Sequence, residues 1–433
     1  MLKVVETFSG IGAQAKALRN IGADFEIIGT ADWDVNAMIA YDLIHNGPQD
    51  LSKYENATRA EMHAKLNKYT LSSDGKVEAS WTVIRNLSMP ILRSVCAAID
   101  RTKNYVSVTD MDGALLPAEM NTLTYSFPCQ DLSVAHAWHG KTNGIDRSAA
   151  NRSSMLWQIE RILKERSNSP LDMPKFLLME NVPNIISRSH SKNFQDWQDS
   201  LEKLGYYNKF YILHANHFGM PQTRKRAYLM SIYVGKNQTL KKKLGKYFSL
   251  PANDLQNVRK HQRSVSDFLR TNYDNETFRI EANSSQPNDT PSRRNIYEKN
   301  IKLLSEGIYS GFVPTITTKQ DRHPNAGVVE YNSNRPGKSK FRYLTGRECM
   351  LLMGFEDRDF EAIMEGNFMK SSTERFFSDT KIVKLAGNSI VVPVLEEIFN
   401  QMIFIDNNFL QLPAKSAKEV MHSQLVNSLS YAA

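Results

Sequence analysis

Short apolar segments that alternate with helical ones are the feature of this chain that most limits its fold. The segments LKVVETF, FEIIGTADWD, YVSVTDMDG, TLTYSFPCQ, KFLLMENVP and RAYLMSIYV are rich in β-branched and aromatic residues, which is typical of strands. After the first of them, Ala15, Leu18 and Ile21 recur near helical spacing. Strands separated by helices predict a mostly parallel sheet covered on both faces. We therefore expect an α/β fold with a doubly wound sheet.

The character of the sequence changes along the chain. From about Lys236 the alternation stops: KNQTLKKKLGKY is rich in lysine, and EANSSQPNDTPSRRN is rich in turn-forming residues. This pattern predicts a second, smaller, basic and irregular domain that extends to about Lys340. A long polar and helical stretch between Asp34 and Tyr105 also interrupts the strands. We interpret residues 45–105 as an insertion at the edge of the sheet.

Charge and cysteine content narrow the class of protein. The 433 residues carry a formal net charge of +8, which suits a polyanionic partner but fits equally well a basic surface without one. The three cysteines, Cys96, Cys129 and Cys349, include no close pair, which argues against a disulfide framework or a thiolate zinc site. The N-terminus does not resemble a signal peptide. The sequence also contains no run of about 18 apolar residues, the length that a membrane-spanning helix needs. We expect a reduced, cytoplasmic protein.

Glycines and acids follow the first predicted strands. In FSGIG, Gly10 and Gly12 allow a ligand to approach the backbone where a doubly wound sheet binds its ligand. Without a third glycine this turn is weak evidence, and it fits a plain helix start equally well. Asp32 and Asp110 each end a predicted strand, where one acid is usually a solvated cap. Two such acids beside the glycine turn, with Trp33 as a face for a purine, indicate a nucleoside ligand.

The stretch SFPCQD places a cysteine directly after a proline at the end of a predicted strand. A lone cysteine is more often an inert, buried small residue than a nucleophile, because a nucleophilic thiol needs a lowered pKa. The next segment, QDLSVAHAWHGKTNGIDRSAANRSS, is polar with little periodicity. Long irregular loops inside compact proteins are often functional lids. Cys129 is therefore either a packing residue or a nucleophile beside a lid.

Three charged residues lie at the ends of later strands. Glu180 in MENVPNII could bind the edge of a base, move protons or simply be solvated. Arg224 and Arg226 alternate in PQTRKRAYLM, so both should project to one face of a strand. Two arginines on a mostly buried strand are costly without an acceptor-rich partner. They either bind a ligand, such as a phosphate, or pair with acids.

In this order the segments resemble the motifs of the DNA (cytosine-5) methyltransferases of bacterial and phage modification systems. ETFSGIGAQ resembles the first motif, ADWD the second, TDMDG the third, SFPCQDLS the fourth and RSSMLWQIERIL the fifth. MENVPNII resembles the sixth, QTRKRAYLMSI the eighth, RYLTGRECMLLMGF the ninth and AGNSIVVPVLEEI the tenth. Each motif alone is weak evidence for the family, but nearly the whole set in this order is specific for it.

This resemblance implies a fold, a reaction and catalytic residues. It implies a Rossmann-like methyltransferase domain that uses S-adenosyl-L-methionine, releases S-adenosyl-L-homocysteine and needs no metal. Cys129 would attack C6 of a cytosine flipped out of duplex DNA, so that C5 takes the methyl group. Glu180 would hold N3 and the exocyclic amine, and Arg226 would contact O2 with Arg224 nearby.

The resemblance also implies binding residues. Contacts with the cofactor would come from Phe8, Ser9, Gly10, Ile11, Gly12, Asp32, Trp33, Asp110, Met111, Pro128, Asn388 and Ser389. Contacts with DNA would come from Gln130, Ser133, Thr315 and Ile316. Two positions depart from the family pattern, because Asp32 stands where glutamate is common and Ala13 where glycine is common. The shorter carboxylate should still reach a ribose diol.

The resemblance predicts two domains. Residues 1–236 and 376–433 should form the catalytic domain, because the helix of the tenth motif returns to it, and residues 237–375 the target recognition domain. The expected protein is a monomer that modifies double-stranded DNA within a restriction-modification system, with any restriction endonuclease on a separate chain. Its recognition sequence depends on loop geometry that the residues do not reveal.

Two alternative functions stay open at this point. An RNA cytosine methyltransferase of the same architecture is the nearer one, but its domain between the eighth and ninth motifs would be smaller. A catalytically silent DNA-binding protein on the same scaffold is the other. The presence of Cys129, Glu180 and Arg226 argues against that loss of activity.

Overall fold

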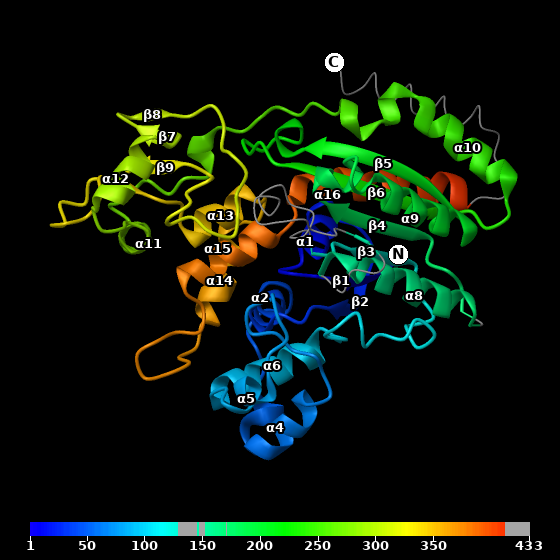
Figure 1. Cartoon of the computed structure of the whole chain (residues 1–433), viewed down its shortest axis with the longest axis horizontal. Helices are drawn as coiled ribbons and strands as arrows, with labels where there is room; N and C mark the ends of the chain where they lie inside the picture. The colour runs from blue at the N-terminus through cyan, green and yellow to red at the C-terminus, as the bar shows by residue number, and fades with distance from the viewer. Residues whose placement is uncertain (129–144, 147–151, 170, 412–433) are drawn as a thin grey trace.

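The computed structural model describes residues 1–128, 145–146, 152–169 and 171–411. These residues form a large sheet with its helices, a helical lobe and a smaller sheet (Figure 1). Cys129, Gln130 and Ser133, three of the predicted site residues, lie outside the described residues. Among the described residues, no helix is long and apolar enough to cross a membrane.

Six strands form the large sheet in the order β2-β1-β3-β4-β6-β5. The pairs β1–β2, β1–β3 and β3–β4 are parallel, whereas β6 is antiparallel to both of its neighbours, β4 and β5. An antiparallel edge on a parallel sheet is common in doubly wound folds. The strands are β1 (Leu2–Thr7), β2 (Phe25–Ala31), β3 (Thr122–Tyr125), β4 (Phe176–Asn181), β5 (Tyr206–His214) and β6 (Lys225–Tyr233).

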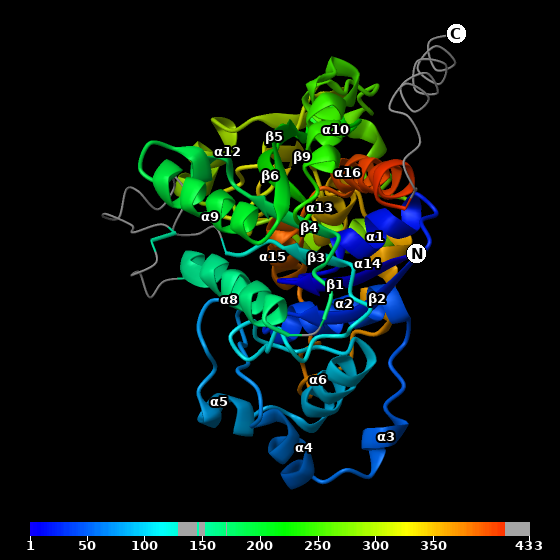
Figure 2. The ribbon, with the colours of Figure 1, turned by 90° about the vertical axis from the view of Figure 1, so that its right-hand side faces the viewer.

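Alternate strand residues supply two hydrophobic cores, one on each face of the large sheet. Val4 and Leu178 belong to the first core, and Val5 and Leu177 to the second. Helices α1 (Ala13–Asn20), α2 (Val35–Asn46) and α16 (Val392–Ile405) contribute to the first core, and α8 (Leu156–Ser167) and α9 (Ser191–Lys203) to the second (Figure 2). Helices thus cover both faces of the large sheet with apolar residues, and the prediction of an α/β fold with a doubly wound sheet is confirmed.

Two parts of the large sheet differ from the sequence prediction. Residues 105–113, predicted as a strand, form turns, because Lys103 (φ 47°) and Val106 (φ 67°) adopt left-handed backbone conformations that interrupt an extended chain. Asp110 therefore does not end a strand. Conversely, β5 has no counterpart among the predicted strands, because polar residues such as Lys209 interrupt its apolar pattern at the edge of the sheet.

Residues 45–105 form a helical lobe beside α2 (Figure 1). Leu92, Val95 and Cys96 of its last helix are fully buried in the first core, which anchors the lobe. The carbonyl of Trp33 accepts a hydrogen bond from the N–H of Ser72 at 2.8 Å, so the lobe also lies against the turn after β2. Its helices are α3 (Ser52–Glu55), α4 (Arg59–Leu66), α5 (Trp81–Arg85) and α6 (Met89–Arg101).

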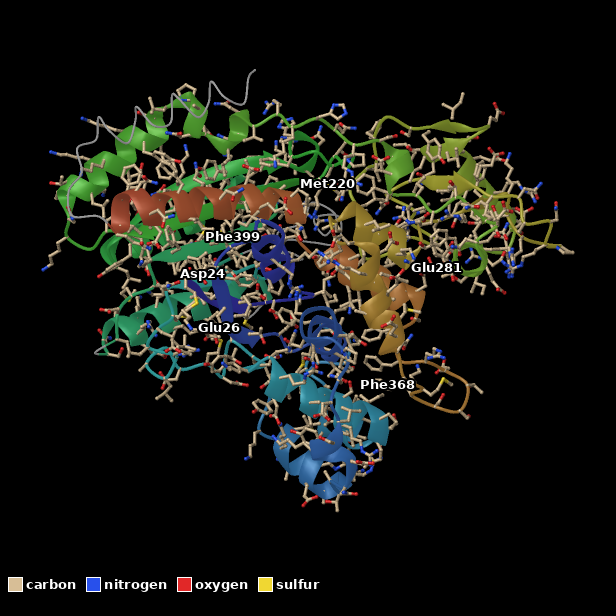
Figure 3. The ribbon with its side chains drawn as sticks, turned by 180° about the vertical axis from the view of Figure 1, so that it is seen from behind. Asp24, Glu26, Met220, Glu281, Phe368 and Phe399 are labelled. Atoms are coloured by element: carbon tan, nitrogen blue, oxygen red, sulfur yellow. The ribbon has the colours of Figure 1, made fainter. Side chains whose placement is uncertain are left out.

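The smaller sheet has four strands in the order β10-β9-β7-β8. These strands are β7 (Lys302–Ser305), β8 (Ile308–Tyr309), β9 (Val328–Glu330) and β10 (Phe341–Arg342). The nearby helices are α11 (Glu276–Ser284), α12 (Pro291–Glu298), α13 (Gly346–Leu352), α14 (Asp357–Glu365) and α15 (Asp379–Asn388). Figure 3 shows Met220 between the two parts, with Glu281 in the smaller part and Phe399 of α16 beside the large sheet.

Helix α10 (Gln238–Ser249) lies along the large sheet, although the predicted recognition domain begins at residue 237. The ring of Phe248 in α10 stacks on that of Tyr207 in β5, with centroids 5.7 Å apart. This contact favours a domain boundary after α10. Short 3₁₀ helices lie at Arg152–Met155, Pro183–Ile186, Ala215–His217, Pro251–Asn253, Leu255–Asn257 and Val265–Asp267, and a π-helical turn at Asp406–Leu410.

Candidate active site

The turn between β1 and α1 leaves its backbone open to a ligand. Phe8, Gly10 and Gly12 have positive φ angles of 54°, 55° and 75°, and Gly12 caps the N-terminus of α1. A Cβ atom on Gly10 would have no heavy atom within 4 Å, whereas one on Gly12 would collide with His45 and Tyr41. Gly10 therefore offers the close approach to the backbone that the sequence predicted, and Gly12 is closed by α2. Ser9 and Ile11 of the same turn are buried.

Asp32 follows β2 and joins this turn to the second strand. Its carboxylate accepts hydrogen bonds from the N–H of Gly10 at 2.8 Å and from that of Asp34 at 2.9 Å. Burial, together with the nearby charge of Asp34, raises the pKa of Asp32 to about 6 against the effect of these hydrogen bonds. Trp33 beside it is half-buried. The turn and Asp32 form one hydrogen-bonded unit at the carboxyl edge of β1 and β2.

Asn104, which sequence reasoning missed, stabilises this unit through hydrogen bonds. Its side-chain amide donates to the carbonyl of Asp32 at 3.2 Å, and its Oδ1 accepts from the N–H groups of Asp32 at 3.2 Å and Val106 at 2.7 Å. It thus connects the second strand to the segment that carries Asp110. No local signal marks Asn104, because it lies 72 positions from Asp32 and outside every motif.

Asp110 and Met111 follow this segment but lie in different surroundings. Met111 is buried in the second core, while the side chain of Asp110 is exposed. Asp110 borders a hollow of about 260 Å³ that the helical lobe also lines, with residues that include Tyr69 and Trp81. The exposed carboxylate accepts from the Thr109 hydroxyl at 3.0 Å and keeps lone pairs for a ligand amine, although it does not lie at the end of a strand.

Glu180 and Arg226 face each other across the carboxyl end of β4 and the start of β6. Glu180 Oε1 lies 3.2 Å from Arg226 Nε, and both side chains are largely buried, at 12% and 17% exposure. The next residue, Asn181, donates from its side-chain amide to the carbonyl of Phe127 at 3.0 Å. Since Phe127 and Pro128 lead directly to Cys129, the end of β4 is tied to the backbone that precedes the predicted nucleophile.

The environment of Glu180 shifts the pKa of its carboxyl. Burial raises the pKa of this carboxyl above its ordinary value, and the positive charges of Arg226 and Arg224 offset part of that rise. A carboxyl that can exist in its protonated form can donate a hydrogen bond to a ring nitrogen. Such a perturbed acid paired with a guanidinium is typical of a functional site.

Arg224, which was predicted to project to the same face as Arg226, is buried and links distant segments of the chain. Its guanidinium donates to the carbonyls of Ile316 at 2.9 Å, Gly387 at 3.1 Å and Ser389 at 2.9 Å. These carbonyls belong to the loop before β9 and to the end of α15. Arg224 thus ties the loop of the predicted recognition domain to the turn that precedes α16.

The remaining predicted residues meet around this connection. Thr315 is half-buried, and Ile316 is fully buried in the first core, so the side chain of Ile316 does not reach the surface. Asn388 is exposed and Ser389 is buried. Gln222, which sequence reasoning missed, is fully buried and bonds the N–H of Ile316 at 3.0 Å. Its place two residues before Arg224, on the same side of an extended chain, was the available signal.

A further acid, Glu6, lies fully buried on β1 directly before the turn. Burial raises its pKa from 4.5 to about 7, against smaller effects of the Tyr41 hydroxyl and the Ala15 backbone. The folded protein therefore holds this proton more tightly than the unfolded chain. The stability that the proton provides is complete below the unfolded pKa and is lost as the pH rises through the folded pKa, by about 3 kcal/mol in total.

We expect Glu6→Gln to flatten this dependence. The unchanged protein should lose about 2–3 kcal/mol of unfolding free energy between pH 5 and pH 8 as Glu6 gives up its proton. The variant should not show this loss, because glutamine has no proton to lose. Urea denaturation of both proteins at the two pH values measures this difference. Glu26→Gln is the control, since Glu26 is more exposed and pairs with Lys3 at the surface. An equal effect of Glu6→Gln at both pH values would contradict the prediction.

Comparison with known proteins identifies the family of this chain. The family model of C-5 cytosine-specific DNA methylases matches residues 94–404. The type II methyltransferase M2.ScrFI of Lactococcus lactis subsp. cremoris is 33% identical over 405 residues, which cover 93% of this chain and 99% of that protein. The orphan methyltransferase M.SssI of Spiroplasma monobiae is 30% identical over 415 residues, which cover 93% and 97% of the two chains.

Solved structures agree in fold. The S. pombe Dnmt2 methyltransferase has a TM-score of 0.55 at 17% identity, over 94% of this chain and 99% of that one. The Entamoeba histolytica methyltransferase EhMeth has the same TM-score and identity, over 94% and 98%. At this identity the likeness shows the fold and nothing finer. The family model and the sequence relatives confirm the resemblance of the motifs: the chain belongs to the C-5 cytosine-specific DNA methylases.

Proposed function

We propose that this protein transfers a methyl group from S-adenosyl-L-methionine to C5 of a cytosine that is flipped out of double-stranded DNA. The observation that carries the proposal is the contact of Glu180 with Arg226 beside the backbone that leads to Cys129. A buried acid with a raised pKa and a neighbouring guanidinium match the ring nitrogen and the carbonyl oxygen of a cytosine edge. Membership of the family supports the same reaction.

The turn and its neighbours fit the cofactor. S-adenosyl-L-methionine supplies an electrophilic methyl group when it is bound. Open space above Gly10 admits a ligand to the backbone, and Asp32 keeps lone pairs for ribose hydroxyls after accepting its two backbone bonds. Phe8 and Trp33 would cover the purine, and Asp110 would accept from its amine. The other proposed contacts are Ser9, Ile11, Gly12, Met111, Pro128, Asn388 and Ser389.

The reaction assigns a bond-forming step to Cys129. Its thiolate Sγ bonds to C6 of the cytosine, which raises the electron density at C5 so that C5 can take the methyl group. A base then removes the proton from C5, the Sγ–C6 bond breaks, and the thiolate returns. Glu180 binds N3 and the exocyclic amine, and Arg226 binds O2, so both stabilise the charge that develops in the ring. Arg224 supports them by fixing the start of β6.

The DNA would lie between the two sheets. Gln130 and Ser133 would meet it from the segment after Cys129, and Thr315 from the loop that Arg224 and Gln222 hold. Ile316 would contribute through its backbone, since its side chain is buried. We place residues 1–236 and 376–433 in the catalytic domain together with α10, and we place the residues from the end of α10 to residue 375 in the target recognition domain.

The named relatives include a type II and an orphan methyltransferase. We therefore propose that the protein is a monomeric modification enzyme of a bacterial or phage-infected cytoplasm. Its cognate restriction endonuclease, where one exists, would be a separate chain.

The test measures transfer of tritiated methyl groups from S-adenosyl-L-methionine. We expect incorporation into duplex DNA and none into transfer RNA, and bisulfite sequencing of the product should locate 5-methylcytosine within one short recurring sequence. The same duplex with 5-methylcytosine already at those positions is the control and should accept no label. Labelling of transfer RNA alone would overturn the assignment to DNA.

A further inference from the structure

His45, at the end of α2, contacts the backbone of the glycine turn from behind. Its Nε2 lies 3.0 Å from the carbonyl oxygen of Ile11, the residue between Gly10 and Gly12. Its Nδ1 lies 3.2 Å from Nη2 of Arg19 on α1. No motif of the sequence includes His45, and the reaction described above leaves it without a role.

The two contacts fix the tautomer of the His45 ring. A guanidinium has donors but no acceptor, so Nδ1 must be the unprotonated nitrogen that accepts from Arg19. The ring proton is then on Nε2, which donates to the carbonyl of Ile11. Burial, with Arg19 and Lys16 nearby, lowers the pKa of His45 to about 3, so the ring stays neutral at ordinary pH.

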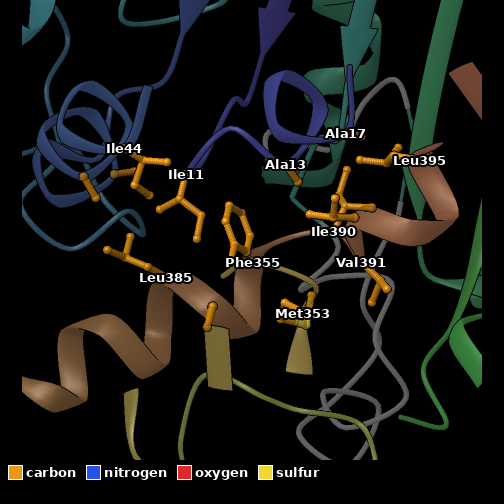
Figure 4. Packing of buried hydrophobic residues seen from close by; sticks show 14 of the residues in the cluster. Ile11, Ala13, Ala17, Ile44, Met353, Phe355, Leu385, Ile390, Val391 and Leu395 are labelled. Atoms are coloured by element: carbon orange, nitrogen blue, oxygen red, sulfur yellow. The ribbon is translucent and has the colours of Figure 1, made fainter. Parts of the chain in front are cut away.

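The surrounding packing leaves the turn little freedom. A Cβ atom on Gly12 would lie 2.1 Å from His45 Nε2, so the ring is seated directly against that glycine. The ring of Tyr41 lies against the ring of His45, with centroids 4.5 Å apart. On the other side, the side chain of Ile11 points into the first core beside Phe355 (Figure 4). The Ile11 carbonyl and side chain are thus both held, while Gly10 stays open.

We propose that His45 is a positioning residue for the cofactor: its Nε2–H holds the Ile11 carbonyl, and so aims the Gly10 backbone and Asp32 at S-adenosyl-L-methionine. This inference rests on the proposed cofactor site. The link to Asp32 is direct, because its carboxylate accepts from the Gly10 N–H. Helix α2 (Val35–Asn46) begins three residues after Asp32 and carries His45 in its last turn, so one helix supports both cofactor-binding segments.

The test separates the donor from the bulk of the ring. His45→Gln places an amide donor near the position of Nε2, whereas His45→Leu fills similar volume without one. Calorimetric titration with S-adenosyl-L-homocysteine should show binding about tenfold weaker for His45→Leu and within about threefold of the unchanged protein for His45→Gln, as the loss of one buried hydrogen bond predicts. The KM for S-adenosyl-L-methionine should rise likewise, with kcat at saturation changed little.

His63→Leu is the matched control, because it removes a histidine of the helical lobe that contacts Trp81 rather than the turn. It should leave the affinity unchanged. Equal affinity in His45→Leu and the unchanged protein, or equal losses in His45→Leu and His45→Gln, would overturn the proposal. A failure of the unchanged protein to bind S-adenosyl-L-homocysteine would instead overturn the cofactor site on which the inference rests.

A second pair of variants tests the tautomer without altering the ring. Arg19 is exposed, so neither Arg19→Met nor Arg19→Lys should disturb folding. Lysine can still donate to Nδ1 and keep the proton on Nε2, whereas methionine cannot. We expect Arg19→Met to bind S-adenosyl-L-homocysteine a few-fold more weakly and Arg19→Lys to bind it normally. Equal affinities in the two variants would contradict the inference, even if His45→Leu proved unstable.

Discussion

Replacing Cys129 with serine should abolish methyl transfer to duplex DNA while leaving the binding of that DNA intact. A serine hydroxyl is hardly ionised at neutral pH and is a far weaker nucleophile than a thiolate, so the attack on C6 should fail. We expect kcat to fall on the order of 10⁴-fold or more, the scale seen when an enzyme loses its nucleophile. Tritium incorporation measures the rate, and a gel-shift titration with the same duplex measures binding.

A covalent trap makes the result specific to the nucleophile. Duplex DNA with 5-fluorocytosine at the target position keeps a fluorine where the C5 proton must leave, so the unchanged enzyme should stay bonded to it. Cys129→Ser should form no such adduct. The control is Cys96→Ala, because Cys96 is buried in the helical lobe and burial raises the pKa of its thiol to about 11. Adduct formation by Cys129→Ser, or its loss in Cys96→Ala, would show that the nucleophile is another residue.

Most of the sheet could be predicted from the sequence because its strands are buried on both faces. Continuous apolar runs such as those of β1 and β4 identify these strands in the sequence, because a strand that is buried on both faces needs apolar residues at successive positions. Residues 105–113 have similar composition, yet the left-handed backbone of Val106 bends the chain there. A β-branched residue rarely adopts that conformation, so only the tertiary contacts of Asn104 and its neighbours reveal it.

The site was predictable to the extent that its chemistry lies in motifs. Glu180 and Arg226 are brought together as strand ends require, but the buried position of Arg224 follows from carbonyls in two distant segments. Asn104 and His45 were missed for the same reason, because each acts on the backbone of a remote turn. Hydrogen bonds to backbone carbonyls constrain residue type weakly, so sequence patterns rarely mark such residues.

The pairing of Glu180 with Arg226 predicts two further losses. Glu180→Gln keeps the shape of the side chain but has no acidic proton, so kcat should fall about 10²–10⁴-fold, the range for a lost acid–base group. Arg226→Met should also lower the rate, because the contact with O2 is lost. Lys225→Met is the matched control: Lys225 is the exposed neighbour on β6, and its loss should change the rate little.

The pH dependence of Arg226→Met distinguishes a charge effect from lost packing. Burial raises the pKa of Glu180, and the Arg226 charge opposes that rise, so removing the charge should raise this pKa further. If the protonated carboxyl binds N3, activity is present below the pKa of Glu180 and is lost as the pH rises through it. The alkaline limb of kcat/KM should therefore move to higher pH in Arg226→Met and stay in place in Lys225→Met. An unmoved limb in Arg226→Met would mean that another group controls it, because a mere packing defect lowers the rate at every pH alike.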